Sequence, residues 1–188
     1  MAKLLGISGS LRNNSYNTAL LQAAAELVPS GSTLEVATVH GIPLYNADEE
    51  AESGVPAPVE ALKKRIAQAD GLVISTPEYN NSMPGVLKNA IDWLSRPPRD
   101  IGRVFGGRPV VLMGASPGAK GTILSQTAWL QVWRTLGMRP WFETSLYVGG
   151  ASKIFDEAGK LSDADTRERL EKLLRGFVAF AEQNRPSL

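Results

Sequence analysis

The chain has 188 residues, a length that favours a single domain spanning residues 1–188. Its 20 Lys and Arg residues nearly balance 19 Asp and Glu residues, which gives a net charge of +1. This balance predicts that neither nucleic acid nor a membrane is a partner. Cysteine is absent and histidine occurs once, which excludes disulfides, thiolate-bound zinc, cysteine-bound iron–sulfur clusters and cysteine nucleophiles. We interpret that histidine, His40, as an exposed loop residue. An enzyme with so few reactive side chains would take its chemistry from a bound organic cofactor.

The N-terminal residues begin a strand at Lys3, which leaves no room for a signal peptide. No apolar run in the sequence approaches the roughly 18 residues that a membrane-spanning helix needs. These two features predict a cytoplasmic protein without membrane insertion.

Short apolar runs alternate along the chain with segments in which apolar residues recur at helical spacing. Strands are predicted at 3–8, 33–39, 71–75 and 109–115, with a fifth strand, broken by Pro140, inside 139–148. Helices are predicted at 17–28, 59–69, 84–94, 122–136 and 162–182, with loops over 41–58 and 96–108. This alternation predicts an α/β protein of the flavodoxin-like, three-layer, doubly wound type, with a five-stranded parallel sheet of order 2-1-3-4-5.

The loop after the first strand is rich in hydroxyl and amide groups and leads into a helix: Gly9-Ser10-Leu11-Arg12-Asn13-Asn14-Ser15-Tyr16-Asn17. A helix N-terminus suits an anion because its N–H groups are unpaired and its dipole end is positive. Ser10, Ser15 and Asn17 add donors, and Arg12 adds a charged one. We interpret the loop as a site for a phosphate monoester, although Ser15 and Asn17 would serve equally well as helix caps. The P-loop and Gly-x-Gly-x-x-Gly motifs are missing, which favours a mononucleotide over a dinucleotide.

The loop after the third strand reads Thr76-Pro77-Glu78-Tyr79-Asn80-Asn81-Ser82-Met83-Pro84-Gly85. Proline near each end restricts its backbone, and the amides and ring between them suit a planar heterocycle with polar edges. In a flavodoxin-like sheet this loop neighbours the first one, and the loop after the fourth strand, at 114–118, flanks it. We therefore expect one pocket with a phosphate end and a ring end. Taken singly, Tyr79 is also explained by ordinary packing, and Asn80 and Asn81 by turn formation.

Two motifs together resemble the NADPH-dependent FMN reductase family: Gly-Ser-Leu-Arg-x-x-Ser-x-Asn at 9–17 and Pro-Glu-Tyr-Asn at 77–80. The similarity continues through 84–93 and is greatest to the bacterial quinone and chromate reductases. The resemblance implies a tightly held FMN cofactor. It assigns Ser10, Arg12, Ser15, Tyr16 and Asn17 to the phosphate end, Pro77, Glu78, Tyr79, Asn80 and Asn81 to the isoalloxazine, and Ser116 to a contact from the fourth loop. The sequence 116–120 is less typical of the family, so the resemblance does not identify the preferred electron acceptor.

The resemblance implies an FMN-dependent NAD(P)H:acceptor oxidoreductase, in which hydride passes from NADPH or NADH through FMN to a quinone or similar small acceptor. Chromate, azo compounds, ferric chelates and free flavin fit the same open flavin face. No catalytic side chain is predicted, because the flavin supplies the chemistry. The main alternative is a flavodoxin-type electron carrier with a protein partner, which the balanced charge disfavours because such carriers dock through acidic surfaces. A nucleotide-binding module without redox activity is a third hypothesis.

In the predicted helix at 122–136, apolar residues cover more of the helix surface than a single narrow stripe. Its apolar residues are Ile123, Leu124, Ala128, Trp129, Leu130, Val132, Trp133 and Leu136. Such a helix is either a core helix or a core helix that also forms a subunit interface, where aromatic residues are common anchors. Together with the family resemblance, this pattern predicts a homodimer or homotetramer.

Overall fold

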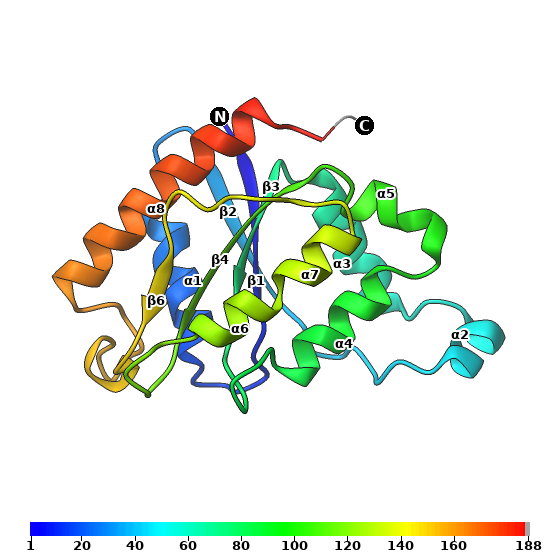
Figure 1. Ribbon diagram of the computed structural model, residues 1–188, viewed down its shortest axis with the longest axis horizontal. Helices are drawn as coiled ribbons and strands as arrows, with labels where there is room; N and C mark the ends of the chain where they lie inside the picture. The colour runs from blue at the N-terminus through cyan, green and yellow to red at the C-terminus, as the bar shows by residue number, and fades with distance from the viewer. Residues whose placement is uncertain (187–188) are drawn as a thin grey trace.

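The computed structural model describes residues 1–186, which form an open parallel sheet between two layers of helices (Figure 1). The strands are β1 (Lys3–Ser8), β2 (Thr33–Thr38), β3 (Gly71–Ser75), β4 (Pro109–Ala115), β5 (Arg139–Pro140) and β6 (Leu146–Val148). The helices are α1 (Tyr16–Leu27), α2 (Ala47–Ser53), α3 (Ala57–Gln68), α4 (Gly85–Leu94), α5 (Ile101–Val104), α6 (Ile123–Ala128), α7 (Leu130–Thr135) and α8 (Ala164–Gln183), with short 3₁₀ turns η1 (Pro98–Asp100) and η2 (Ala151–Lys153). The sheet order, β2-β1-β3-β4-β5, confirms the predicted flavodoxin-like, doubly wound fold.

Two hydrophobic cores lie on opposite faces of the sheet, because successive side chains of a strand point to opposite sides. Val73 of β3 packs into the core that includes α1 and α8. Its neighbours Leu72 and Ile74 pack into the second core, with α3, α4 and α7. Figure 1 shows the same division of the helices between the two faces. All of β3 is buried, as expected of a parallel strand that is covered on both sides.

The last strand position holds two short strands, so the sheet has six strands where the sequence predicts five. Pro140 does not cause the break, since it lies within β5 and pairs with Val110. The break is the segment 141–145, after which β6 pairs with residues 113–115 of β4. Proline is tolerated in β5 because an edge strand leaves one row of N–H groups without ladder partners.

Several helix boundaries also differ from those predicted. The predicted loop 96–108 contains η1 and α5, and the last helix begins at Ala164 behind its cap, Asp163. The predicted helix 122–136 is interrupted at Trp129, whose carbonyl accepts a hydrogen bond from Val132 N in the tight i+3 pattern. None of the helices within residues 1–186 is long and apolar enough to cross a membrane.

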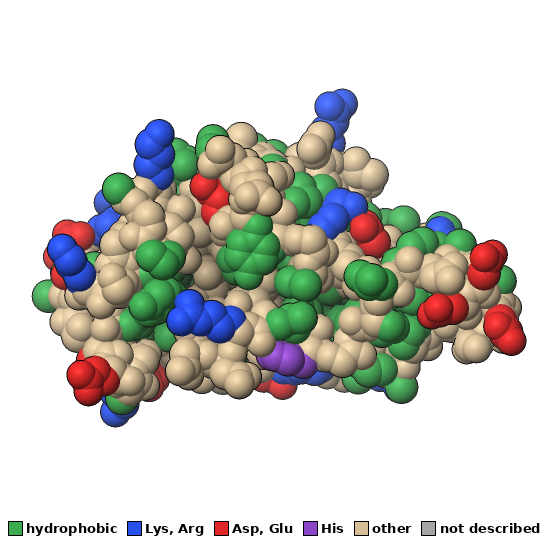
Figure 2. All heavy atoms as spheres, turned by 90° about the horizontal axis from the view of Figure 1, so that it is seen from below, with side chains coloured by type: hydrophobic (Ala, Val, Ile, Leu, Met, Phe, Trp, Pro, Cys, Tyr) green, Lys and Arg blue, Asp and Glu red, His purple; other side chains and the backbone are tan. Residues whose placement is uncertain are grey.

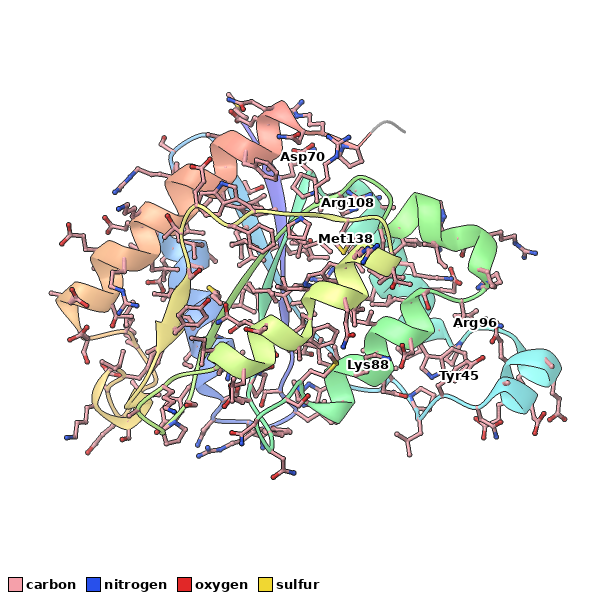
Figure 3. The ribbon with its side chains drawn as sticks, in the orientation of Figure 1. Tyr45, Asp70, Lys88, Arg96, Arg108 and Met138 are labelled. Atoms are coloured by element: carbon pink, nitrogen blue, oxygen red, sulfur yellow. The ribbon has the colours of Figure 1, made fainter. Side chains whose placement is uncertain are left out.

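The predicted loop 41–58 contains α2, which projects from the body of the molecule and buries none of its own residues (Figure 1). Asn46 caps the N-terminus of this helix, and its side chain accepts a hydrogen bond from Asp48 N. Tyr45 and Arg96 lie against each other where this segment meets the end of α4 (Figure 3), with the guanidinium 5.8 Å from the ring centre. Arg96 also bonds Glu50 (2.8 Å) and thereby holds the pKa of that carboxyl below its ordinary value.

The amino group of Lys63 on α3 is fully buried between two carboxylates, which ties α3 to η1. Its nitrogen lies 2.8 Å from Glu60 and 2.7 Å from Asp100. The hydrogen bond from Lys63, assisted by one from Arg103, lowers the pKa of Asp100. Because the folded-state pKa is depressed, the stability from this carboxylate is present above its ordinary pKa and is lost as the pH falls through the lower folded-state value.

We predict that Asp100→Ala lowers the free energy of unfolding at neutral pH by on the order of 3 kcal/mol, because Lys63 stays buried with one partner fewer. The wild type is expected to lose this contribution to the free energy of unfolding below about pH 4, where aspartate begins to protonate. The variant lacks the carboxylate, so its stability should not show this loss. Urea denaturation at a series of pH values measures both effects. Identical acid slopes in the two proteins would contradict the prediction.

Candidate functional site

Three loops leave the carboxyl edge of the sheet side by side, at the lower end of the molecule in Figure 1 and face-on in Figure 2. We call them the first loop (9–15), the ring loop (76–84) and the fourth loop (116–122). Gly9 N donates to Ser75 O, and Thr76 N donates to Met113 O, both at 2.9 Å. The three strands therefore end in step, and the loops meet at the edge where doubly wound sheets bind ligands.

Two glycines allow the loops to approach each other closely. A Cβ on Gly9 would lie 2.7 Å from Leu87 and 3.1 Å from Pro77, between the first loop and the ring loop. A Cβ on Gly114 would lie 2.4 Å from Thr76 O and 2.1 Å from the hydroxyl oxygen of Thr122. Larger residues at these two positions would therefore push the three loops apart.

The first loop ends in the N-terminus of α1, as predicted. Ser15 caps the helix, and its hydroxyl oxygen accepts a hydrogen bond from Thr18 N (3.4 Å). Ser10, also buried, accepts one from Arg12 N (3.3 Å). The first N–H groups of a helix have no partner within it. The first turn of α1 contains no carboxylate, whereas those of α2 and α8 do, so this N-terminus keeps its positive potential for an anion.

Arg12 and Tyr16 form a stack beside this helix end. The Arg12 guanidinium lies 5.8 Å from the centre of the Tyr16 ring, and that ring stacks on Phe155 at 5.6 Å. Arg12 remains exposed to solvent. The aromatic pair supports an extended, charged side chain next to unpaired helix amides, an arrangement suited to a phosphate.

The side chain of Asn17 points into the protein and is fully engaged there. Its nitrogen donates to Ala115 O (2.9 Å), and its oxygen accepts from Ala115 N (3.0 Å) and from the Ser75 hydroxyl (3.0 Å). Asn17 thus joins the start of α1 to the ends of β3 and β4. Its carboxamide positions the loops, and its backbone N–H lies in the first turn of α1, where N–H groups have no partner within the helix.

The tip of the ring loop is a two-residue hairpin turn. Tyr79 N donates to Ser82 O (3.1 Å), and Ser82 N donates to Tyr79 O (3.0 Å). Asn80 and Asn81, between them, have φ of 50° and 60°. Both angles are left-handed, as a type I′ turn requires, and asparagine is among the residues that accept them most readily. The two amides and the Tyr79 ring, 49% exposed, all stand in solvent at the sheet edge.

Glu78 and Pro77, predicted to border a ring, face the protein. One oxygen of Glu78 accepts hydrogen bonds from Leu124 N (2.8 Å) and Ser125 N (3.0 Å) at the start of α6. Pro77 is buried, and its carbonyl accepts a hydrogen bond from the Thr76 hydroxyl (3.0 Å). At these two positions only the backbone and the second Glu78 oxygen are left to reach a ligand.

Ser116 holds the fourth loop in shape. Its hydroxyl donates to Gly121 O (2.9 Å), its N–H donates to Val148 O (2.9 Å), and its carbonyl accepts from Ala151 N (3.0 Å). The side chain is half-buried beside Ala115, the residue that Asn17 binds. This loop is therefore fixed to β6 and η2 on the far side of the site.

A buried chain of hydroxyls beneath the ring loop was not singled out from the sequence. Thr76 accepts hydrogen bonds from Trp129 Nε1 (3.1 Å) and pairs with the Ser125 hydroxyl (2.9 Å). The signal available in the sequence is a polar residue within an otherwise apolar helix, as Ser125 is. That signal does not identify a partner 49 positions away.

His40 is an exposed loop residue, as predicted, and one ring nitrogen lies 3.1 Å from Leu11 O in the first loop. Among the described residues, no carboxylate or hydroxyl bonds to His40, so it has no partners for a Ser-His-Asp triad. Within residues 1–186 no three His, Asp or Glu side chains gather closely enough to hold a metal ion. The side chains that the three loops leave exposed at the sheet edge include the Arg12 guanidinium, the amides of Asn80 and Asn81 and the Tyr79 ring.

The chain belongs to the NADPH-dependent FMN reductase family, whose model matches residues 2–153. The match covers all three loops and confirms the resemblance carried by 9–17 and 77–80. Membership makes the chain an oxidoreductase of the NAD(P)H- and FMN-dependent kind.

Individual relatives agree with this assignment. An NAD(P)H-dependent FMN reductase of Pseudomonas aeruginosa is 44% identical over 183 residues, which is 97% of each chain. A 2-hydroxy-1,4-benzoquinone reductase of a Burkholderia species is 38% identical over 97% of this chain and 98% of its own. Among solved structures, FerB of Paracoccus denitrificans, a flavoenzyme NAD(P)H:(acceptor) oxidoreductase, superposes with a TM-score of 0.86 at 29% identity, over 98% of this chain and 100% of its own.

We predict that Asn17→Ala lowers the free energy of unfolding of the FMN-free protein by about 2–4 kcal/mol, because three buried polar groups lose their partner. Urea denaturation without flavin measures this loss. Asn14→Ala, at an exposed asparagine of the same loop, is the matched control and should be nearly neutral. If both variants were equally stable and Asn17→Ala lost only FMN affinity, the Asn17 side chain would contact FMN and would not hold the loops together.

Proposed function

We propose that this enzyme reduces quinones with NADPH or NADH, and that FMN stays bound as its cofactor. The observation that carries the proposal is the meeting of a phosphate-suited helix end and an exposed, polar turn at one sheet edge. The name of the Burkholderia relative, a 2-hydroxy-1,4-benzoquinone reductase, supports quinones as the substrate class, and that of the Pseudomonas relative supports NAD(P)H and FMN.

The phosphate end of the proposed site is the start of α1. The first-turn N–H groups of Tyr16 and Asn17, the hydroxyls of Ser10 and Ser15, and the Arg12 guanidinium would hold the phosphate. These donors fit FMN because none of them is countered by a carboxylate in the first loop or the first turn of α1. A charge-assisted pair with Arg12 would add retention without contributing to the fold, since that side chain is exposed.

The ring end of the proposed site is the turn of the ring loop, flanked by the fourth loop. Backbone groups of Pro77, Glu78, Asn80 and Asn81 would border the polar edge of the isoalloxazine. Tyr79 would cover part of the ring, and Ser116 would border it from the opposite side. These loops are internally hydrogen-bonded, so the site is largely formed before the flavin binds, which lowers the cost of ordering on binding.

Bound FMN would supply the redox chemistry, with NADPH or NADH as the source of hydride. The chain's own part is to hold the flavin, orient its ring and leave one face open to alternating substrates. The one carboxylate in the ring loop, Glu78, is already committed to α6, and no general acid or base is assigned. An open face also suits chromate, azo compounds, ferric chelates or free flavin as acceptors, and we propose quinones first.

The proposal predicts that the purified protein is yellow, bleaches when NADPH or NADH is added without oxygen, and regains colour when benzoquinone follows. Flavin released by heat should be FMN. The rates of bleaching with the two nucleotides measure the preference between them. A coloured protein that neither nucleotide bleaches would contradict the proposal and favour an electron carrier with a protein partner. A protein that stays colourless after FMN addition would favour a module without redox activity.

We also propose that the protein is a cytoplasmic homodimer or homotetramer. Part of the predicted apolar helix remains exposed in the single chain: Ile123, Leu124 and Leu130 are 38%, 43% and 37% exposed. Phe142, 66% exposed, lines the same cavity as Leu130. Exposed apolar side chains that lie together, as Leu130 and Phe142 do, are typical of a subunit interface. Light scattering at working concentration is expected to give at least twice the chain mass, and a monomer mass would contradict this.

A further inference from the structure

The ring loop is joined to α6 by the only carboxylate in the three loops. Glu78 is half-buried, and one of its oxygens accepts the N–H groups of both Leu124 and Ser125, at 2.8 and 3.0 Å. A hydrogen bond to a charged group is roughly twice as strong as a neutral one. The carboxylate also sits at the positive end of α6, where the helix dipole favours it.

Thr76, two residues before Glu78, ties the same loop to the same helix from the buried side. Its hydroxyl donates to Pro77 O and accepts from Trp129 Nε1, so the contact at 2.9 Å with Ser125 has Ser125 as donor. Every hydrogen-bonding position of this buried hydroxyl is thereby used. Residues 76–78 are consequently held on both sides, and the hairpin turn that follows them has a fixed base.

We propose that Glu78 is a positioning residue for the flavin ring: by capping α6 it fixes the Tyr79–Ser82 turn against the fourth loop. This inference rests on the proposed function, because it concerns where the ring lies. The side chain acts through the turn and α6, and it takes no part in hydride transfer. Small displacements of a reacting group are costly to a reaction, so a fixed turn is a functional requirement and not only a structural one.

The test compares Glu78→Ala with Glu78→Gln, which keeps an acceptor oxygen of the same reach but loses the charge. We expect Glu78→Ala to raise the dissociation constant of FMN about tenfold or more, because the turn loses the side-chain oxygen that ties it to α6. Its bound flavin should absorb more like free FMN. Hydrogen exchange at Leu124 and Ser125 should quicken in the FMN-free protein. Glu78→Gln should restore affinity to within about threefold of wild type.

Asp163→Ala is the matched control. Asp163 caps α8 by accepting a hydrogen bond from Thr166 N (2.8 Å), the same kind of bond on the opposite layer from α6. It should lose a similar amount of thermal stability and leave the affinity for FMN and the flavin spectrum unchanged. If Glu78→Ala does not fold, Glu78→Asp replaces it, since a side chain one carbon shorter cannot hold both amides.

Three outcomes would overturn the inference. The first is faster exchange at Leu124 and Ser125 with wild-type FMN affinity and spectrum, which would make Glu78 a cap and nothing more. The second is an equal loss of FMN affinity in Asp163→Ala, which would indicate general destabilisation. The third is a Glu78→Gln variant as weak as Glu78→Ala. A wild-type protein that binds no FMN would instead refute the proposed function itself, a result that the wild-type titration distinguishes from all three.

Discussion

The buried carboxamide of Asn17 is the contact on which the site depends. It joins the first turn of α1 to the ends of β3 and β4 through three hydrogen bonds of 2.9–3.0 Å. Those strands begin the ring loop and the fourth loop, so one side chain sets the distance between all three. Because a buried polar group without a partner is costly, the contact is strongly favoured once α1 packs on the sheet.

The two ends of the proposed flavin site are stiffened in different ways. At the phosphate end the donors belong to a helix, whose first amides point outward and need no ordering when an anion arrives. At the ring end the donors belong to a turn with left-handed Asn80 and Asn81, braced from below by Thr76 and Glu78. Because FMN would supply the reactive group, the protein's main role is to hold the flavin in position. These hydrogen bonds order the site before the flavin binds.

The sheet order and the place of the site could be predicted because buried parallel strands such as 71–75 and 109–115 appear as apolar runs, and ligand loops follow their carboxyl ends. The roles within the site could not all be predicted in the same way. Asn17 meets Ala115, 98 positions away, and Glu78 meets Leu124, 46 positions away, so neither inward orientation has a local signal. The predicted helix 122–136 is interrupted at Trp129, whose indole N–H donates to Thr76, 53 positions away. This contact also has no local signal in the sequence.

The most direct test of the account is the ratio of affinities for FMN and riboflavin, which differ only in the phosphate. If the start of α1 anchors that phosphate, wild type should bind FMN at least about 100-fold more tightly than riboflavin, as a charge-assisted anion site allows. Arg12→Ala should reduce this ratio about tenfold and leave riboflavin affinity and fold stability unchanged. Equal affinity of the wild type for the two flavins would contradict the central claim.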